Sequence, residues 1–210
     1  MTTTPGPAPS RDHGGFFSGR LQARQRPVDP AREHLSVSEW LFRSAPAGAL
    51  WLVVRLWIGW RWADASYQKI WGSDRRGFWF GGGAVKGFAL VGVARSHGTQ
   101  PEVAYGWWAA FLHNFVAPNA AWLAKVVSLG EFAVGLGLIL GLFVGIAATA
   151  GVTLNVTFML SGVAWVNPVY ALAGVLLMLA WRNAGLIGLD HWALPAMGLP
   201  SHPGSLFRRR

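Results

Sequence analysis

The sequence predicts an all-α integral membrane protein, namely a four-helix bundle with short interfacial helices in the loop after helix one. Of the 210 residues, 52% are apolar and only 13% are charged. A soluble domain usually carries about 25% charged residues, so too few remain here to cover a surface exposed to water. Long apolar segments and regularly spaced small residues support the same class.

Four segments have the length and composition of membrane-spanning helices. About 20 apolar residues are needed to cross the hydrocarbon core. The predicted spans are Ala47–Tyr67, Trp122–Phe143, Gly145–Trp165 and Pro168–Ile187. The connections between the last three spans are only a few residues long, so these helices should be antiparallel neighbours.

The segment between the first and second spans, residues 68–121, is apolar and aromatic in two places. Phe78–Val93 and Tyr105–Phe115 are too short to cross a bilayer and are interrupted by glycines. We expect both to form short helices on one membrane face. A small soluble cap is the alternative, although Trp107 and Trp108 would make its surface unusually apolar.

The two ends of the chain are rich in basic residues. Residues 1–45 combine prolines with scattered arginines and predict a disordered cytoplasmic tail, and residues 192–210 form a basic tail after the bundle at 46–191. An even number of spans puts both termini on one side, and the positive-inside rule makes that side cytoplasmic. The net charge of +9 is therefore read as orienting the protein and attracting anionic lipid, and no nucleic-acid partner is expected.

Small residues recur at four-residue spacing in the predicted spans. Span one contains Gly59-x3-Ala63, and span two leads into Gly137-x3-Gly141-x3-Gly145. Lipid chains are as apolar as leucine, so membrane helices associate through close backbone approach at such small residues. These stripes predict a tightly packed bundle.

Three polar residues lie in the predicted middle of the membrane, where a charge costs at least ~2.5–3.5 kcal/mol. At 1.5 Å per residue, Arg55 is about 12 Å, Glu131 about 18 Å and Asn155 about 15 Å from the cytoplasmic ends of their helices. Arg55 and Glu131 have opposite charges and share faces with small residues. We expect them to pair inside the bundle, either as a functional site or as a structural ion pair.

The chain contains no cysteine, which excludes thiolate chemistry, iron–sulfur ligation by cysteine and covalently attached haem. The histidines do not predict a haem site, because His113 and His191 fall on opposite sides of the membrane. No metal-ligand spacing is recognisable, so no metal site is expected. Any redox reaction would need a quinone, a non-covalent cofactor or a partner protein.

Several sequence features together resemble the DoxX family of small bacterial membrane proteins. They are Arg55-Leu56-x2-Gly59, Gln68-Lys69, Gly130-Glu131, Asn155, Asn167-Pro168 and Asn183-Ala184-Gly185-x2-Gly188-Leu189-Asp190. Their order across four helices carries the resemblance, which covers about residues 47–191. The stretch Lys86–Asn119 looks like the extended loop of the longer members, which resemble the DoxD-type membrane subunit of thiosulfate:quinone oxidoreductase.

The resemblance implies a multi-pass protein of the bacterial cell membrane that passes electrons from thiosulfate to quinone. Arg55 and Glu131 would then bind and protonate quinone, with Ser128 and Asn155 nearby. The ring would be flanked by Trp57, Trp60 or Trp62. Lys69 and Lys86 would attract the substrate anion. Two alternatives stay open: a non-catalytic scaffold for a redox complex, and a small-solute transporter. The expected partners are the bilayer, a redox subunit and a second copy of the chain.

Overall fold

The computed structural model describes residues 2, 37–99 and 101–199, and within these residues the regular elements are all helices. The chain divides into residues 1–35 and 36–210. Residues 1 and 3–36 of the predicted disordered tail lie outside the described residues, as does the end of the basic C-terminal tail, whereas residues 37–43 of that predicted tail are helical. Helix α1 (Val37–Arg43) belongs to the second unit, so this unit begins earlier than the predicted boundary at residue 46.

The predicted spans all form helices, and the third and fourth differ most from the predicted limits. They correspond to α2 (Ala47–Ile70), α6 (Ala120–Leu140), α7 (Val144–Leu160) and α8 (Asn167–Leu179) followed by α9 (Trp181–Gly185). The third span stops early because the chain turns after Leu160, where Gly162 has φ of 79° and Trp165 has φ of 29°. The fourth is interrupted at Ala180, where α8 ends and α9 begins.

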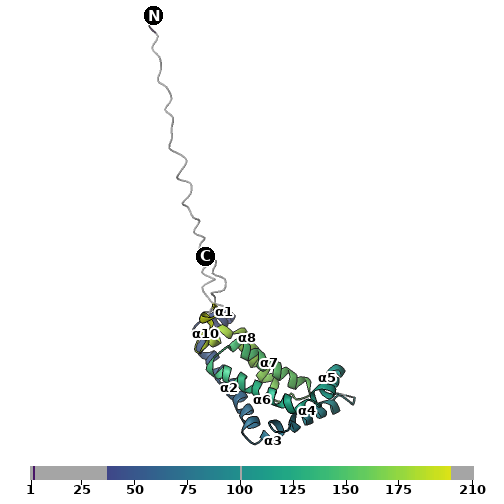
Figure 1. The fold of residues 1–210 in the computed structure, drawn as a ribbon. Coiled ribbons are helices and arrows are strands. Elements are labelled where there is room, and N and C mark those ends of the chain that lie inside the picture. Colours follow the sequence, from purple (N-terminus) through teal and green to yellow (C-terminus); the bar gives the residue numbers. More distant parts are fainter. Residues whose placement is uncertain (1, 3–36, 100, 200–210) are drawn as a thin grey trace. The chain divides into compact units, whose positions relative to one another are not determined.

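Helices α2 and α6 pack side by side in opposite directions (Figure 1). Glycines make this approach close. A Cβ on Gly59 would lie 3.0 Å from Leu138 Cβ, and one on Gly135 would lie 2.6 Å from the backbone nitrogen of Ala63. The predicted Gly59–Ala63 stripe thus forms a helix contact, and its partner includes Gly135, one of the small residues on the predicted inward face of Glu131.

A tight turn joins α6 to α7. Gly141 and Phe143 both have positive φ, 66° and 50°, which is unusual for a bulky side chain such as phenylalanine. The turn makes α6 and α7 antiparallel neighbours, and α8 packs along α7 through Gly174, which faces Val152.

The segment between α2 and α6 folds into short helices: α3 (Arg75–Phe78), α4 (Gly83–Ala94), α5 (Gly106–Phe111) and the π-helix η2 (Leu112–Val116). Both predicted helices in this segment are therefore present. They share an apolar cluster that includes Ala89, Val103 and Trp108. Figure 1 shows these elements at the opposite end of the long helices from α1 and α10 (Asp190–Ala196).

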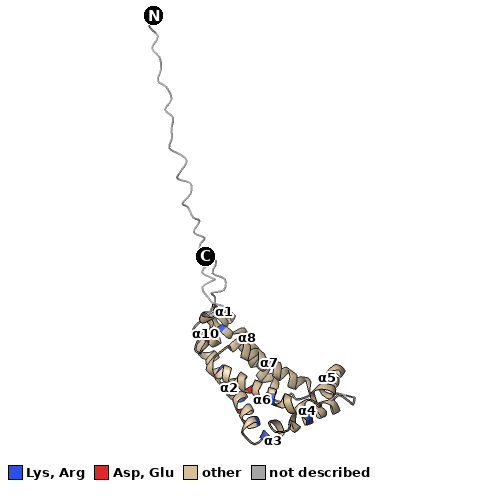
Figure 2. Ribbon diagram, in the orientation of Figure 1, with Lys and Arg blue, Asp and Glu red and all other residues tan. Residues whose placement is uncertain are grey.

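Polar and apolar side chains are distributed unusually. The fully buried polar set is Arg55, Ser66, Ser128, Glu131, Asn155, Ser161, Asn183 and Asp190, whereas Val53, Trp60, Ile146 and Leu172 are each more than 60% exposed. Helices α7 and α8 carry no charged residue (Figure 2). By length and composition, Ala120–Leu140 is the one described helix that could cross a bilayer; Gly83–Ala94, Val144–Leu160 and Asn167–Leu179 are apolar but shorter.

Candidate functional site

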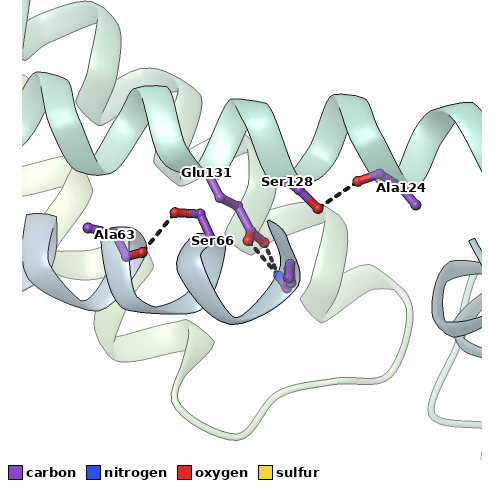
Figure 3. A network of polar contacts seen from close by, with 6 residues as sticks. Ala63, Ser66, Ala124, Ser128 and Glu131 are labelled. Atoms are coloured by element: carbon purple, nitrogen blue, oxygen red, sulfur yellow. Dashed lines mark hydrogen bonds and ion pairs between the residues drawn. The ribbon is translucent and has the colours of Figure 1, made fainter. Parts of the chain in front are cut away.

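A buried carboxylate lies between α2 and α6. The Glu131 side chain is 1% exposed, and both of its oxygens accept hydrogen bonds from the Lys69 ammonium, whose side chain is 16% exposed. Ser66 and Ser128 point into the same space between the two helices (Figure 3). Their hydroxyls donate to Ala63 O and Ala124 O, one turn back along their own helices, so their oxygens remain able to accept.

Lys69 also lines an apolar cavity of about 460 Å³. Small-molecule sites usually measure ~300–1,000 Å³ and combine apolar walls with a few polar groups. The walls come from the short helices α3, α4, α5 and η2 and from parts of α2, α6, α7 and α8, and they are rich in aromatic rings: Phe78, Phe88, Trp108, Phe111, Phe115 and Phe158. The cavity therefore has the size and lining of a site for a flat apolar molecule.

The polar groups of the cavity are few. Lys69 provides the single charged side chain among the lining residues, and its ammonium also lies 5.0 Å from the centre of the Phe78 ring. Thr157 and Asn167 line the cavity as well; each donates to a backbone carbonyl four residues earlier. A ligand with a hydrogen-bond acceptor on an apolar ring would match this arrangement.

The backbone beside the cavity is irregular. Leu112, Phe115 and Val116 line it from the π-helix η2, and Phe111 stacks on Phe115 with ring centres 5.2 Å apart. Short π-helical segments occur frequently at functional sites, because the extra residue in the turn re-aims side chains. Here η2 and the residue before it place the rings of Phe111 and Phe115 in the wall of the same cavity.

The predicted pairing of Arg55 with Glu131 is wrong. The Arg55 guanidinium donates to Ala184 O at 2.8 Å and Ile187 O at 2.7 Å, near the C-terminal end of α9. Arg55 lies at the level of the turn after α6, next to Gly141, whereas Glu131 is ten residues earlier, about 15 Å along α6. The first two turns of α2 extend beyond the end of α6. Arg55 and Glu131 therefore lie at different levels along the bundle.

Arg55 instead belongs to a group of buried polar residues, the end cluster, formed by Arg55, Asn183 and Asp190. The Asp190 carboxylate accepts from the backbone nitrogens of Phe143 and Val144 at 2.6 and 3.0 Å, at the start of α7. Asn183 donates to two carbonyls around α1, including Ser44 O. These bonds satisfy helix ends, so the end cluster holds α1, α2, α7, α9 and α10 together.

The remaining predicted site residues lie in three different places. Ser128 lies beside Glu131 (Figure 3). Trp62 and Asn155 are buried in the bundle around Gly151: the Asn155 amide donates to Gly151 O, and its side-chain oxygen has no partner. Lys86 is exposed on α4 and does not line the cavity, although its neighbour Val85 does.

Neither the pairing of Lys69 with Glu131 nor the aromatic cavity was predicted from the sequence. The pairing of Lys69 with Glu131 follows from the register in which α2 packs against α6. Gly59 packs against Leu138 and Ala63 against Gly135, so the antiparallel register puts Glu131 opposite Ser66, one turn before Lys69. The cavity had no such signal in the sequence, because the rings of residues 78–115 form it only where the short helices fold against α6 and against Phe158 of α7.

The fold and site define an all-helical protein with an aromatic cavity and an ion pair at its wall. Comparison with protein families, curated proteins and solved structures finds no match to this chain. Its function is therefore inferred from the geometry of the site and from the sequence resemblance.

Proposed function

We propose that this chain is an integral membrane protein in which α2, α6, α7 and α8–α9 cross the bilayer. Exposed apolar side chains such as Trp60, Ile146 and Leu172 support this, because soluble monomers rarely expose large contiguous apolar patches. The buried polar side chains support it too, since polar groups in membrane helices usually face the bundle interior. In this arrangement the loop helices lie at the outer membrane face and both termini are cytoplasmic.

Within that protein, we propose that the aromatic cavity binds a quinone. The observation that carries the proposal is the Lys69 ammonium in the wall of a 460 Å³ apolar cavity, bonded to the buried Glu131. A quinone is a flat apolar ring with carbonyl oxygens. The aromatic rings of Phe111 and Phe115 can stack on the flat quinone ring. The Lys69 ammonium can donate a hydrogen bond to a quinone carbonyl oxygen.

The ion pair suits quinone reduction. Conversion of a quinone to a quinol consumes two electrons and two protons, and negative charge develops on the oxygens before they are protonated. Lys69 would stabilise that charge, and the Lys69–Glu131 pair could pass a proton to the oxygen. The electrons would come from thiosulfate: two ions joined through a new sulfur–sulfur bond form tetrathionate and release two electrons.

This assigns the chain to the membrane subunit of a thiosulfate:quinone type of oxidoreductase, as the sequence resemblance implies. The cysteine-free sequence contains no thiol to carry those electrons, so a partner subunit would deliver them. A non-catalytic scaffold for a redox complex is the second candidate, and the same missing thiols favour it.

Quinone binding to the purified protein tests the proposal. Protein extracted gently from its native membrane should retain quinone, and added quinone should bind to the emptied protein with 1:1 stoichiometry. Val127→Trp, which fills the cavity, should abolish binding. Val126→Trp is the matched control, because that side chain is 55% exposed on the same helix. Absence of quinone from folded wild-type protein, with co-purification of a redox subunit, would support the scaffold instead.

A further inference from the structure

A second apolar cavity, of about 400 Å³, lies at the end of the bundle that carries the end cluster. Its walls come from the start of α7, the end of α8, Trp181, α10 and the residues just after α10. Phe143, Ile146, Met178, Leu194 and Met197 are apolar members of the lining. Ile146 is 70% and Met197 58% exposed, so the cavity is an accessible groove rather than part of the core.

Arg182 lies beside this groove. Its guanidinium is 4.8 Å from the centre of the Trp181 ring, and Trp181 lines the groove and packs against the position of Gly145. The Arg182 Nε is buried and has no hydrogen-bond partner. Among residues 37–99 and 101–199, the ion pairs are Lys69–Glu131 and Arg95–Glu102, so Arg182 has no carboxylate partner there.

The one acidic residue that lines the groove, Asp190, forms no ion pair with Arg182 in the described part of the chain, and its charge interacts with Arg55 of the end cluster. Both Asp190 oxygens are occupied by the backbone nitrogens of Phe143 and Val144. The groove therefore combines an apolar channel with an unpaired cation next to it. A lipid with an acyl chain and an anionic headgroup is complementary to this groove in both polarity and charge.

We propose that this groove binds one anionic phospholipid, with an acyl chain along Ile146 and Met178 and the phosphate at Arg182. The chain's own C-terminal residues are a less suitable occupant, because residues 200–210 contain three arginines and no acid, which would repel Arg182. The proposal rests on the membrane location given above and does not depend on quinone binding. Its failure can therefore be distinguished from failure of the quinone site.

Native mass spectrometry of the full-length protein tests the proposal, with phosphatidylglycerol compared with phosphatidylcholine of identical acyl chains. Wild-type protein should retain one phosphatidylglycerol preferentially. Arg182→Gln should weaken its binding about fivefold, since one basic residue near a lipid surface is worth about 1 kcal/mol. Arg182→Lys should retain most of the affinity. Arg76→Gln, which removes an exposed arginine at the opposite end, should have no effect.

A second variant tests the apolar part. Ile146→Asn makes one wall of the groove polar at a largely exposed position, so the fold should survive while lipid retention falls. Equal retention of both lipids, equal losses in the Arg182 and Arg76 variants, or competition by inorganic phosphate alone would each overturn the proposal. So would lipid binding that appears only after residues 200–210 are removed, because the C-terminal segment would then be the occupant.

Discussion

At the scale of single residues, the buried Glu131 carboxylate depends on one ammonium group. Removing one partner of a buried ion pair leaves an uncompensated charge, at a cost of roughly 3–5 kcal/mol. Lys69→Met should therefore lower the free energy of unfolding by about this amount. Thermal or chemical unfolding in detergent measures it.

The double variant Lys69→Met/Glu131→Leu provides the matching control. It removes both charges and should recover much of the lost stability, because apolar replacement of a whole buried pair is often neutral. For comparison, Glu102→Gln breaks the exposed pair with Arg95 and should cost less than about 1 kcal/mol. Equal effects of Lys69→Met and Glu102→Gln would contradict the buried pair.

Arg55 should behave differently from Glu131. Arg55→Met removes two charge-assisted hydrogen bonds to carbonyls, each worth about 1.5–3 kcal/mol, so the variant should be several kcal/mol less stable. Quinone affinity of the remaining folded protein should be unchanged, whereas Lys69→Met should reduce it. Loss of binding in folded Arg55→Met protein would restore the original assignment of Arg55 to the site.

Arg55 and Glu131 show which features of the site could be predicted from the sequence and which could not. Burial of Arg55 and Glu131 was predicted correctly, because charge in an apolar segment must face the interior. Their pairing was wrong, because both depths were counted from helix ends taken to lie at one level, whereas Arg55, eight residues into α2, is level with Gly141 at the end of α6. Lys69 was assigned to the outer loop because its long side chain, which reaches back into the bundle, has no signature in the sequence.

At the scale of helices, the close approach of α2 and α6 should be sensitive to one methyl group. A Cβ at Gly135 would meet the Ala63 backbone at 2.6 Å, so Gly135→Ala should separate the helices and destabilise the protein by roughly 1–3 kcal/mol. Gly130→Ala, on the same helix with nothing within 4 Å, should be neutral or stabilising by up to ~1 kcal/mol. Thermal unfolding of both variants provides the comparison.

The helices themselves were largely predictable, because apolar length and glycine or proline breaks are local signals. The break at Ala180 was not. It coincides with Asn183 turning to bond the carbonyls near α1, a contact that joins residues about 140 positions apart. Such long-range bonds decide where a helix is interrupted, and no local pattern contains them.

At the scale of the whole molecule, the proposed topology can be tested by single-cysteine labelling, since the native chain has no cysteine. Ser73→Cys lies exposed between α2 and α3 and should react with a membrane-impermeant maleimide in intact cells. Ser205→Cys, in the C-terminal tail, should react only after the membrane is permeabilised. The opposite pattern would invert the topology, and equal labelling of both sites would argue against a membrane-spanning bundle.

The Asp190 carboxylate has a consequence for biosynthesis. It caps the start of α7 from 46 residues further along the chain, and the neighbouring nitrogen of Asp190 bonds Gly141 O. The turn between α6 and α7 therefore leaves the ribosome without its stabilising partner and must wait until nearly the whole bundle has been translated. A nascent chain halted before residue 190 would have its helices formed, but the connection between them would still be open.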